Sequence, residues 1–223
     1  PQEENKLSQL APGLELVKDY GWFTILAKPL FWLLTQLHKL IGNWGFAIVA
    51  LVVLLKIAFF WLNDLLFASL QHAQGINWIF LPAGFRVLLV LVLGLPGALG
   101  IVAGNLWLDQ AYLQTGDLLP VLLAALVSGL GPWAVRQWMT GQRLLDHELK
   151  DITAARLLNF VLIYAAVNAV FHQFIRWNFQ IANSQPLIDI WPMFMGDTIG
   201  ALAVLYAFKI SMPWLKAWAH KRI

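Results

Sequence analysis

Long apolar stretches separated by short polar ones dominate this chain. A helix needs roughly 20 apolar residues to cross a hydrocarbon core of about 30 Å. Five stretches come close to that length, and each has few charges. They lie at 46–66, 78–95, 118–138, 157–175 and 187–210. We therefore predict an all-α fold, a polytopic membrane bundle with about five transmembrane helices.

The apolar stretch at 21–45 is interrupted by polar side chains. Lys28, Gln36, His38 and Lys39 divide it, and these side chains are costly in hydrocarbon. The pattern favours an amphipathic helix that lies in the membrane interface. The alternative is a poor transmembrane helix.

A Gly-rich segment follows the second predicted span, at 96–113. If the polar join between the first two spans is cytoplasmic, this segment cannot be a full crossing. We expect it to re-enter the membrane or to pack as a broken helix against its neighbours.

Composition supports this interpretation. Hydrophobic residues make up 60% of the 223 residues, charged residues make up 12%, and the mean hydropathy is +0.67. A soluble domain has about a quarter of its residues charged, so much of this surface must face lipid. The chain has no cysteine, which excludes disulfides and thiolate chemistry.

The basic residues give an expected orientation. Arg143, Lys150 and Arg156 lie in one charged loop, and the C-terminal tail 213–223 is also basic. Two predicted spans separate the loop from the tail, so both are expected on the cytoplasmic side. The N-terminal tail 1–20 is expected to be periplasmic. It lacks the basic start of a signal peptide, and its first residue, proline rather than methionine, is what a fragment would give.

The first part of the chain carries a specific series of motifs. It reads "DYGWF", "KPLFWLL" and "GNWGFAI", and a basic residue, Lys56, follows halfway through the next span. This series resembles the YidC/Oxa1 family of membrane-protein insertases over roughly the first 60 residues. The resemblance implies a periplasmic interfacial helix and then a helix whose basic residue, here Lys56, lies in a water-filled groove. It also implies nascent membrane proteins, and the Sec translocon, as partners besides membrane lipids, and no nucleic acid.

The resemblance ends after this point. Trp61 stands where the family has a proline, and no charged cytoplasmic hairpin follows. The later motifs "INWIFLPAG", "PGALGIVAGN" and "MGDTIGAL" are instead similar in layout to the MASE1 type of membrane sensory domain. The chain then resembles a fusion or composite.

Five parts follow from these two resemblances. They are a periplasmic tail at 1–20, a YidC/Oxa1-like part at 21–66, a join at 67–77, a MASE1-like multi-span module at 78–212 and a basic cytoplasmic tail at 213–223.

Lys56 is the first candidate for function. A charge at mid-bilayer costs at least about 2.5–3.5 kcal/mol on insertion scales, so such a residue usually faces a cavity or a partner. Snorkelling to the interface is the alternative. The resemblance favours a substrate groove, in which the basic group attracts acidic parts of an inserting segment.

Arg86 and Asp197 also lie within predicted spans. A desolvated carboxylate needs a donor, so we predict an intramembrane ion pair between them. The pair could be purely structural, or it could sense a ligand or proton.

Further polar side chains share helix faces. Asn168, His172 and Arg176 are spaced four residues apart, and Asn105 and Asp109 form a similar pair. Both sets could line a polar cavity or only make interhelical hydrogen bonds.

The sequence contains no zinc-protease, phosphate-loop or nucleophile-elbow motif. We predict no catalytic residue, no metal, no cofactor and no enzymatic activity. The functional hypothesis is an integral protein of the bacterial inner membrane with a YidC/Oxa1-type role in insertion or as a chaperone, incomplete because the hairpin and later insertase helices are missing. The alternative is a MASE1-like sensory or ligand-binding module without an attached output domain.

Overall fold

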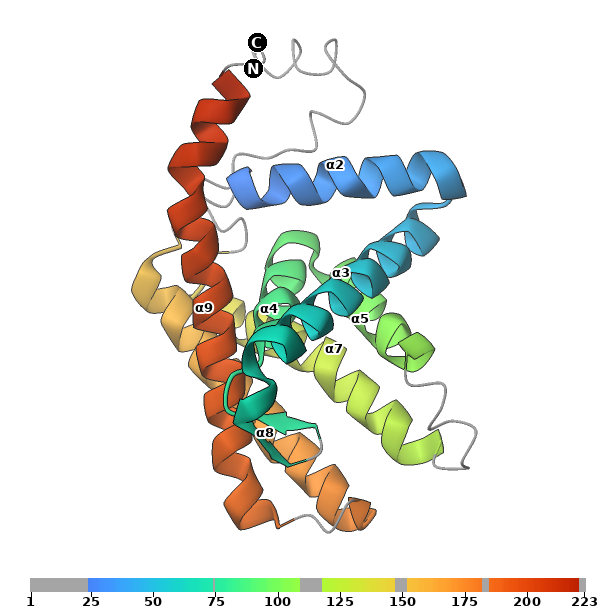
Figure 1. Cartoon of the computed structure of the whole chain (residues 1–223), viewed down its shortest axis with the longest axis vertical. Coiled ribbons are helices and arrows are strands. Elements are labelled where there is room, and N and C mark those ends of the chain that lie inside the picture. The colour runs from blue at the N-terminus through green and yellow to red at the C-terminus, as the bar shows by residue number, and fades with distance from the viewer. Residues whose placement is uncertain (1–23, 74, 109–117, 147–151, 182–184, 221–223) are drawn as a thin grey trace.

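The computed structural model describes residues 24–220, apart from 74, 109–117, 147–151 and 182–184. The described residues form a bundle of helices with one short antiparallel hairpin, so the predicted all-α membrane bundle is confirmed (Figure 1). The elements are α2 (Thr24–Ile41), α3 (Trp44–Phe67), η3 (Ala68–Leu70), β1 (Gln71–Ala73), β2 (Ile76–Asn77), α4 (Leu81–Leu93), α5 (Leu95–Leu108), α7 (Leu118–Gly141), α8 (Ala154–Asn178) and α9 (Pro186–His220).

Four of the described helices are long and apolar enough to cross a membrane. They cover Trp44–Leu70, Leu118–Gly141, Ala154–Asn178 and Pro186–Ala207. These segments match four of the five predicted spans. The chain is an integral membrane protein.

The fifth expected span, 78–95, is replaced by the short helix α4. Its 13 residues extend for about 20 Å, which is less than the hydrocarbon core of about 30 Å. Gly94 ends this helix with a positive φ of 65°, which glycine adopts without steric cost. The chain then reverses into α5, and the two helices form a hairpin (Figure 1).

The α4–α5 helical hairpin shows how the Gly-rich segment 96–113 is arranged, which we expected to re-enter the membrane or to pack as a broken helix. Its described part is α5, with 14 residues. A Cβ at Gly97 would lie 2.5 Å from the Leu89 carbonyl oxygen, so only glycine lets α5 approach α4 this closely. Residues 109–113 of the segment lie outside the described residues.

Helix α4 is the centre of the bundle. Ten of its residues are buried, and α3, α5, α7 and α9 pack around it. Its apolar side chains join the largest core cluster, which includes Leu88, Leu91, Phe160 and Tyr164. A helix covered on all sides explains why α4 has no polar face except at Arg86.

Two glycines dock α9 against the start of α4. A Cβ at Gly196 would clash with the Asn77 carbonyl oxygen, and one at Gly200 would clash with the Phe80 carbonyl oxygen. The Phe80 N–H donates to the Gly196 carbonyl at 3.0 Å. Small residues that let backbones approach are a common basis of helix association in membranes.

A side chain from a different helix caps α4. The Leu81 N–H donates to Asn63 Oδ1 of α3 at 3.0 Å, and Asn63 is buried. The first backbone N–H groups of a helix have no partner inside it. Asn63 supplies an acceptor that the Phe80 side chain cannot, and the sequence analysis did not identify this role.

Helix α2 lies across one end of the molecule, crosswise to α9 (Figure 1). Leu34 is buried against α3, whereas Trp32 and Lys39 are exposed. The helix packs near the C-terminal part of α9, so both lie at the same end. A periplasmic α2 and a cytoplasmic tail at 213–223 therefore do not fit this arrangement together. The tail 1–20 is outside the described residues.

The α4–α9 contact gives a stability prediction. Gly200→Ala forces a methyl group against the Phe80 carbonyl, and we expect a loss of about 1–3 kcal/mol in the free energy of unfolding. Gly131→Ala on α7 is the control because its Cβ would meet nothing within 4 Å. Alanine favours a helix by up to about 1 kcal/mol, so this control should leave stability unchanged or raise it. Unfolding of the purified protein in detergent measures both, and equal midpoints would contradict the docking role of Gly200.

Candidate functional site: a polar cavity within the bundle

A cavity of about 200 Å³ lies inside the helical bundle. Residues from α3, α4, α5, α7, α8 and α9 line it, together with the strand β2. The cavity is therefore lined by residues from both the YidC/Oxa1-like part at 21–66 and the later part at 78–212. Its charged and polar lining residues are Lys56, Asn77, Arg86, Asn105, Ser128, His172 and Asp197.

Lys56 points toward this cavity. Its Nζ donates to Asn105 Oδ1 at 2.5 Å and lies 5.6 Å from the centre of the Phe60 ring. The neighbouring side chains Leu54 and Ile57 are exposed on the outer surface of α3. The structure thus places Lys56 on the inner face of the helix, beside a hydrogen-bond partner 49 positions later in the chain.

Arg86 and Asp197 line the same cavity. The Arg86 guanidinium lies 5.3 Å from the Phe80 ring centre. It also interacts electrostatically with three groups on α8 and α9, which are Asp197, Tyr164 and His172. Asp197 is only 2% exposed, and its Oδ2 accepts a hydrogen bond from Asn168 Nδ2 at 2.6 Å. The structure brings together the two residues that the sequence analysis paired.

His172 connects α8 to α7. Its Nδ1 lies 3.0 Å from the Asn168 carbonyl oxygen, which can only accept, so this nitrogen carries the hydrogen. The Nε2 of a neutral ring is then an acceptor for the Ser128 hydroxyl at 3.2 Å. These two bonds hold the ring against the cavity wall and connect α8 to α7.

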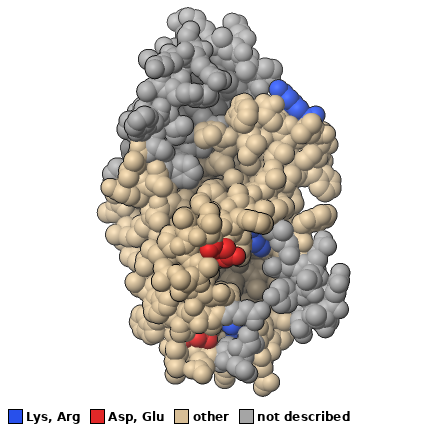
Figure 2. Space-filling model, viewed as in Figure 1, with Lys and Arg blue, Asp and Glu red and all other residues tan. Residues whose placement is uncertain are grey.

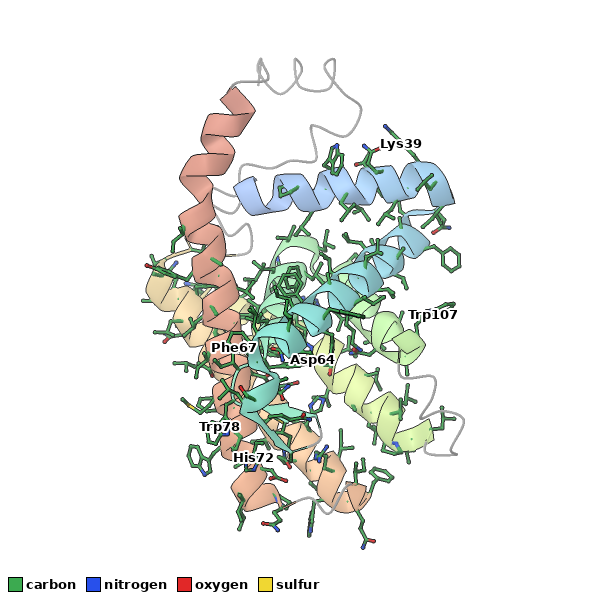
Figure 3. All side chains as sticks on the ribbon, in the orientation of Figure 1. Lys39, Asp64, Phe67, His72, Trp78 and Trp107 are labelled. Atoms are coloured by element: carbon green, nitrogen blue, oxygen red, sulfur yellow. The ribbon has the colours of Figure 1, made fainter. Side chains whose placement is uncertain are left out.

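The three residues predicted to share one face of α8 do not belong to one hydrogen-bond network. Asn168 and His172 belong to the cavity network, but Arg176 lies outside the cavity lining and interacts electrostatically with Asp189. Asp189 also pairs with His72 at 3.2 Å, next to the short β-hairpin. Figure 3 shows His72 and Trp78 near that end of the molecule, and Lys39 and Trp107 pointing outward from α2 and α5.

Other residues lie beyond the sequence predictions or beyond the described chain. Ser128 was not selected, although it is a polar residue within the apolar run of α7 and this alone could have identified it. Asp109, predicted as the partner of Asn105 on one face, lies outside the described residues.

The part of the cavity wall that the structure describes carries more basic than acidic side chains. It holds two cationic side chains and one carboxylate. Among the residues that the structure describes, no three histidine, cysteine, aspartate or glutamate side chains are grouped to hold a metal ion. Figure 2 shows a hollow on one face of the molecule, with basic and acidic atoms at its edge.

The Arg86–Asp197 pair can be tested with a double-mutant cycle. Removing one member leaves a buried charge without its partner, so Asp197→Leu alone should cost about 3 kcal/mol or more. Adding Arg86→Leu should recover part of that loss, with a coupling energy of at least about 1 kcal/mol in unfolding experiments. Additive effects within about 0.5 kcal/mol would show that the two groups do not interact.

Comparisons with known proteins concern the N-terminal part of the chain. Residues 1–33 match the YidC periplasmic domain family. Membrane protein insertase YidC of Ralstonia nicotianae and that of Cupriavidus necator are each 63% identical over 77 residues. The match covers 34% of this chain and 14% of each relative. The same insertase of Burkholderia ambifaria is 57% identical over 77 residues.

The chain thus spans about a seventh of the length of these curated relatives, by the 14% coverage of each. No solved structure matches the chain. None of these matches supports the MASE1-like interpretation of residues 78–212. The N-terminal third of this membrane protein is YidC/Oxa1-like, as its motifs predicted.

Proposed function

We propose that this chain assists the insertion of membrane proteins into the bacterial inner membrane in the manner of the YidC/Oxa1 insertases. One observation carries the proposal: Lys56, on the YidC-like helix α3, faces a polar cavity instead of lipid. The proposed partners are nascent membrane proteins and the Sec translocon, besides lipids. Nucleic acid is not a partner.

The cavity would lower the cost of moving a polar segment into the bilayer. An acidic side chain at mid-bilayer costs about 2.5–3.5 kcal/mol on insertion scales. An opposite charge at 4 Å returns about 4 kcal/mol at an effective dielectric constant of 20. The Lys56 ammonium therefore supplies an interaction of the size that the step requires.

The activity needs no covalent chemistry, so we propose that the protein is not an enzyme. Substrate would bind through exchange of hydrogen bonds, in which an acidic side chain takes the place of Asn105 Oδ1 at Lys56. The charged hairpin of the insertase family has no counterpart in this sequence. In its place, most of the residues that line the cavity with Lys56 come after position 77.

The proposed orientation keeps the basic loop between α7 and α8 and the tail 213–223 on the cytoplasmic side. The two flank the crossings α8 and α9, so an even number of spans separates them. An excess of basic residues in such segments favours the cytoplasm. This orientation places the α2 end of the bundle at the cytoplasmic face, in contrast to the periplasmic helix that the resemblance implies.

Insertase-depleted cells test the proposal. The unmutated chain should restore insertion of a small single-span substrate with an acidic translocated segment. Lys56→Ala should reduce the inserted fraction about tenfold, the effect of losing about 1.4 kcal/mol, and Lys56→Arg should retain it. Lys39→Ala, which removes an exposed lysine on α2, is the matched control and should insert normally.

Two outcomes would contradict this account. If the unmutated chain restores no insertion, the insertase function is wrong. If Lys56→Ala restores insertion as well as the unmutated chain, the function stands but the role given to Lys56 is wrong. Protease protection of the substrate's translocated segment measures insertion in every strain.

A further inference from the structure

The size of the cavity limits what it can admit. One turn of a helix, about 10 Å across and 5.4 Å long, occupies roughly 400 Å³. The cavity measures about 200 Å³, so it has room for a side chain but not for the backbone of a helical segment. A helical segment that brings an acidic group to Lys56 must therefore reach in with its side chain alone, or part of the cavity wall must move.

The β1–β2 hairpin forms one part of that wall. Gly75, Ile76 and Asn77, from its turn and second strand, line the cavity. The two strands have only three and two residues, and a two-stranded hairpin is marginally stable by itself. A Cβ at Gly75 would meet no atom within 4 Å, so the turn has open space around it. The hairpin can therefore move at a lower cost than the helices that form the rest of the wall.

The hairpin is attached to the bundle through few side chains. Of its six described residues within 71–77, only Ile76 is buried. Opening the hairpin would thus expose one buried side chain, whereas moving α4 would expose ten buried residues. The end of β2 is anchored, because the Asn77 carbonyl packs against Gly196 of α9 and the Phe80 N–H donates to the Gly196 carbonyl at 3.0 Å. The turn and β1 are the parts that can swing about this anchor.

A side-chain pair joins β1 to α9. His72 Nε2 lies 3.2 Å from Asp189 Oδ1, and a carboxylate oxygen accepts, so the imidazole N–H donates. Asp189 is only 6% exposed, and its Oδ2 accepts from the Gln185 N–H at 3.0 Å, which holds the carboxylate in place at the start of α9. Arg176 of α8 also interacts electrostatically with Asp189, so the carboxylate keeps a basic neighbour when His72 leaves. Figure 3 shows His72 beside the hairpin, at the end of the molecule away from α2.

We propose that the β1–β2 hairpin is a lid of the polar cavity, held closed by the His72–Asp189 pair. When the pair breaks, β1 and the turn swing away from α9, and the cavity widens enough to admit more than a side chain. The lid itself does not depend on the proposed function. The partner that it admits, an inserting segment with an acidic side chain, rests on that function.

Thiol accessibility tests the lid without any inserting protein. Ser128→Cys places a single thiol on the cavity wall, at a position that is 4% exposed. A charged methanethiosulfonate reagent is applied to the purified full chain in lipid nanodiscs. His72→Ala should raise the rate at which this thiol is modified about three- to tenfold, the effect of losing one hydrogen bond. His72→Gln still offers an N–H to Asp189 and should leave the rate near its original value.

Two controls separate opening of the lid from general loosening of the bundle. His38→Ala removes a histidine that stacks on Trp44 at the α2 end, and it should not change the rate. A thiol at Val161→Cys, in the core and outside the cavity lining, should stay unreactive in the His72→Ala variant. An unchanged Ser128→Cys rate in His72→Ala, an equal increase in His72→Gln, or equal acceleration at Val161→Cys would overturn the lid.

A reversible cross-link tests what the lid admits. His72→Cys and Asp189→Cys together place two thiols at the pair, and a short bifunctional methanethiosulfonate bridges them. In membrane vesicles from the insertase-depleted cells, bridging should lower the inserted fraction at least about fivefold, and reduction should restore it in the same sample. Unchanged insertion with the hairpin bridged would overturn the admission of the segment past the lid. If the unmutated chain inserts nothing while the accessibility result holds, the proposed function is wrong and the lid remains.

Discussion

The cost of holding a charge in hydrocarbon is the constraint on which this structure depends. Lys56, Arg86 and Asp197 lie within apolar stretches of three helices, α3, α4 and α9. Each would cost several kcal/mol if it faced lipid. Turning all three into one cavity gives the cations a carboxylate and gives each group a polar neighbour. The rotation of each helix about its axis is thereby restricted, because the charged side chain within its apolar stretch must face the cavity.

Close backbone contact makes this arrangement possible. Gly196 and Gly200 let α9 reach the backbone that leads into α4, and Gly97 lets α5 fold back on α4. The short central helix is thus covered on every side, and its single charged side chain, Arg86, can reach the groups of α8 and α9. The same glycines therefore serve both packing and electrostatics. They bring α9 close to the start of α4, and they also bring Asp197, next to Gly196, to the cavity.

Hydropathy alone predicted the four long helices, and charges inside apolar runs identified Lys56, Arg86 and Asp197. The sequence could not show that α4 ends early, because Gly94 and the backbone contacts of Gly97 depend on the tertiary fold. The bond between Lys56 and Asn105 joins residues 49 positions apart, and no local pattern encodes such a contact. Two separate modules were expected on either side of 67–77, yet both contribute to one cavity.

The account's central claim is that Lys56 faces a polar, water-accessible cavity while its neighbour on α3 faces lipid. The chain has no cysteine, so a cysteine introduced at either position is the only thiol that the reagent can modify. Thiols react as thiolates, which form readily only in contact with water. In membranes, a charged, water-soluble methanethiosulfonate reagent should modify Lys56→Cys at least about tenfold faster than Ile57→Cys, which is exposed on the outer surface of α3. Equal rates, or faster modification of Ile57→Cys, would show that position 56 does not face a hydrated cavity.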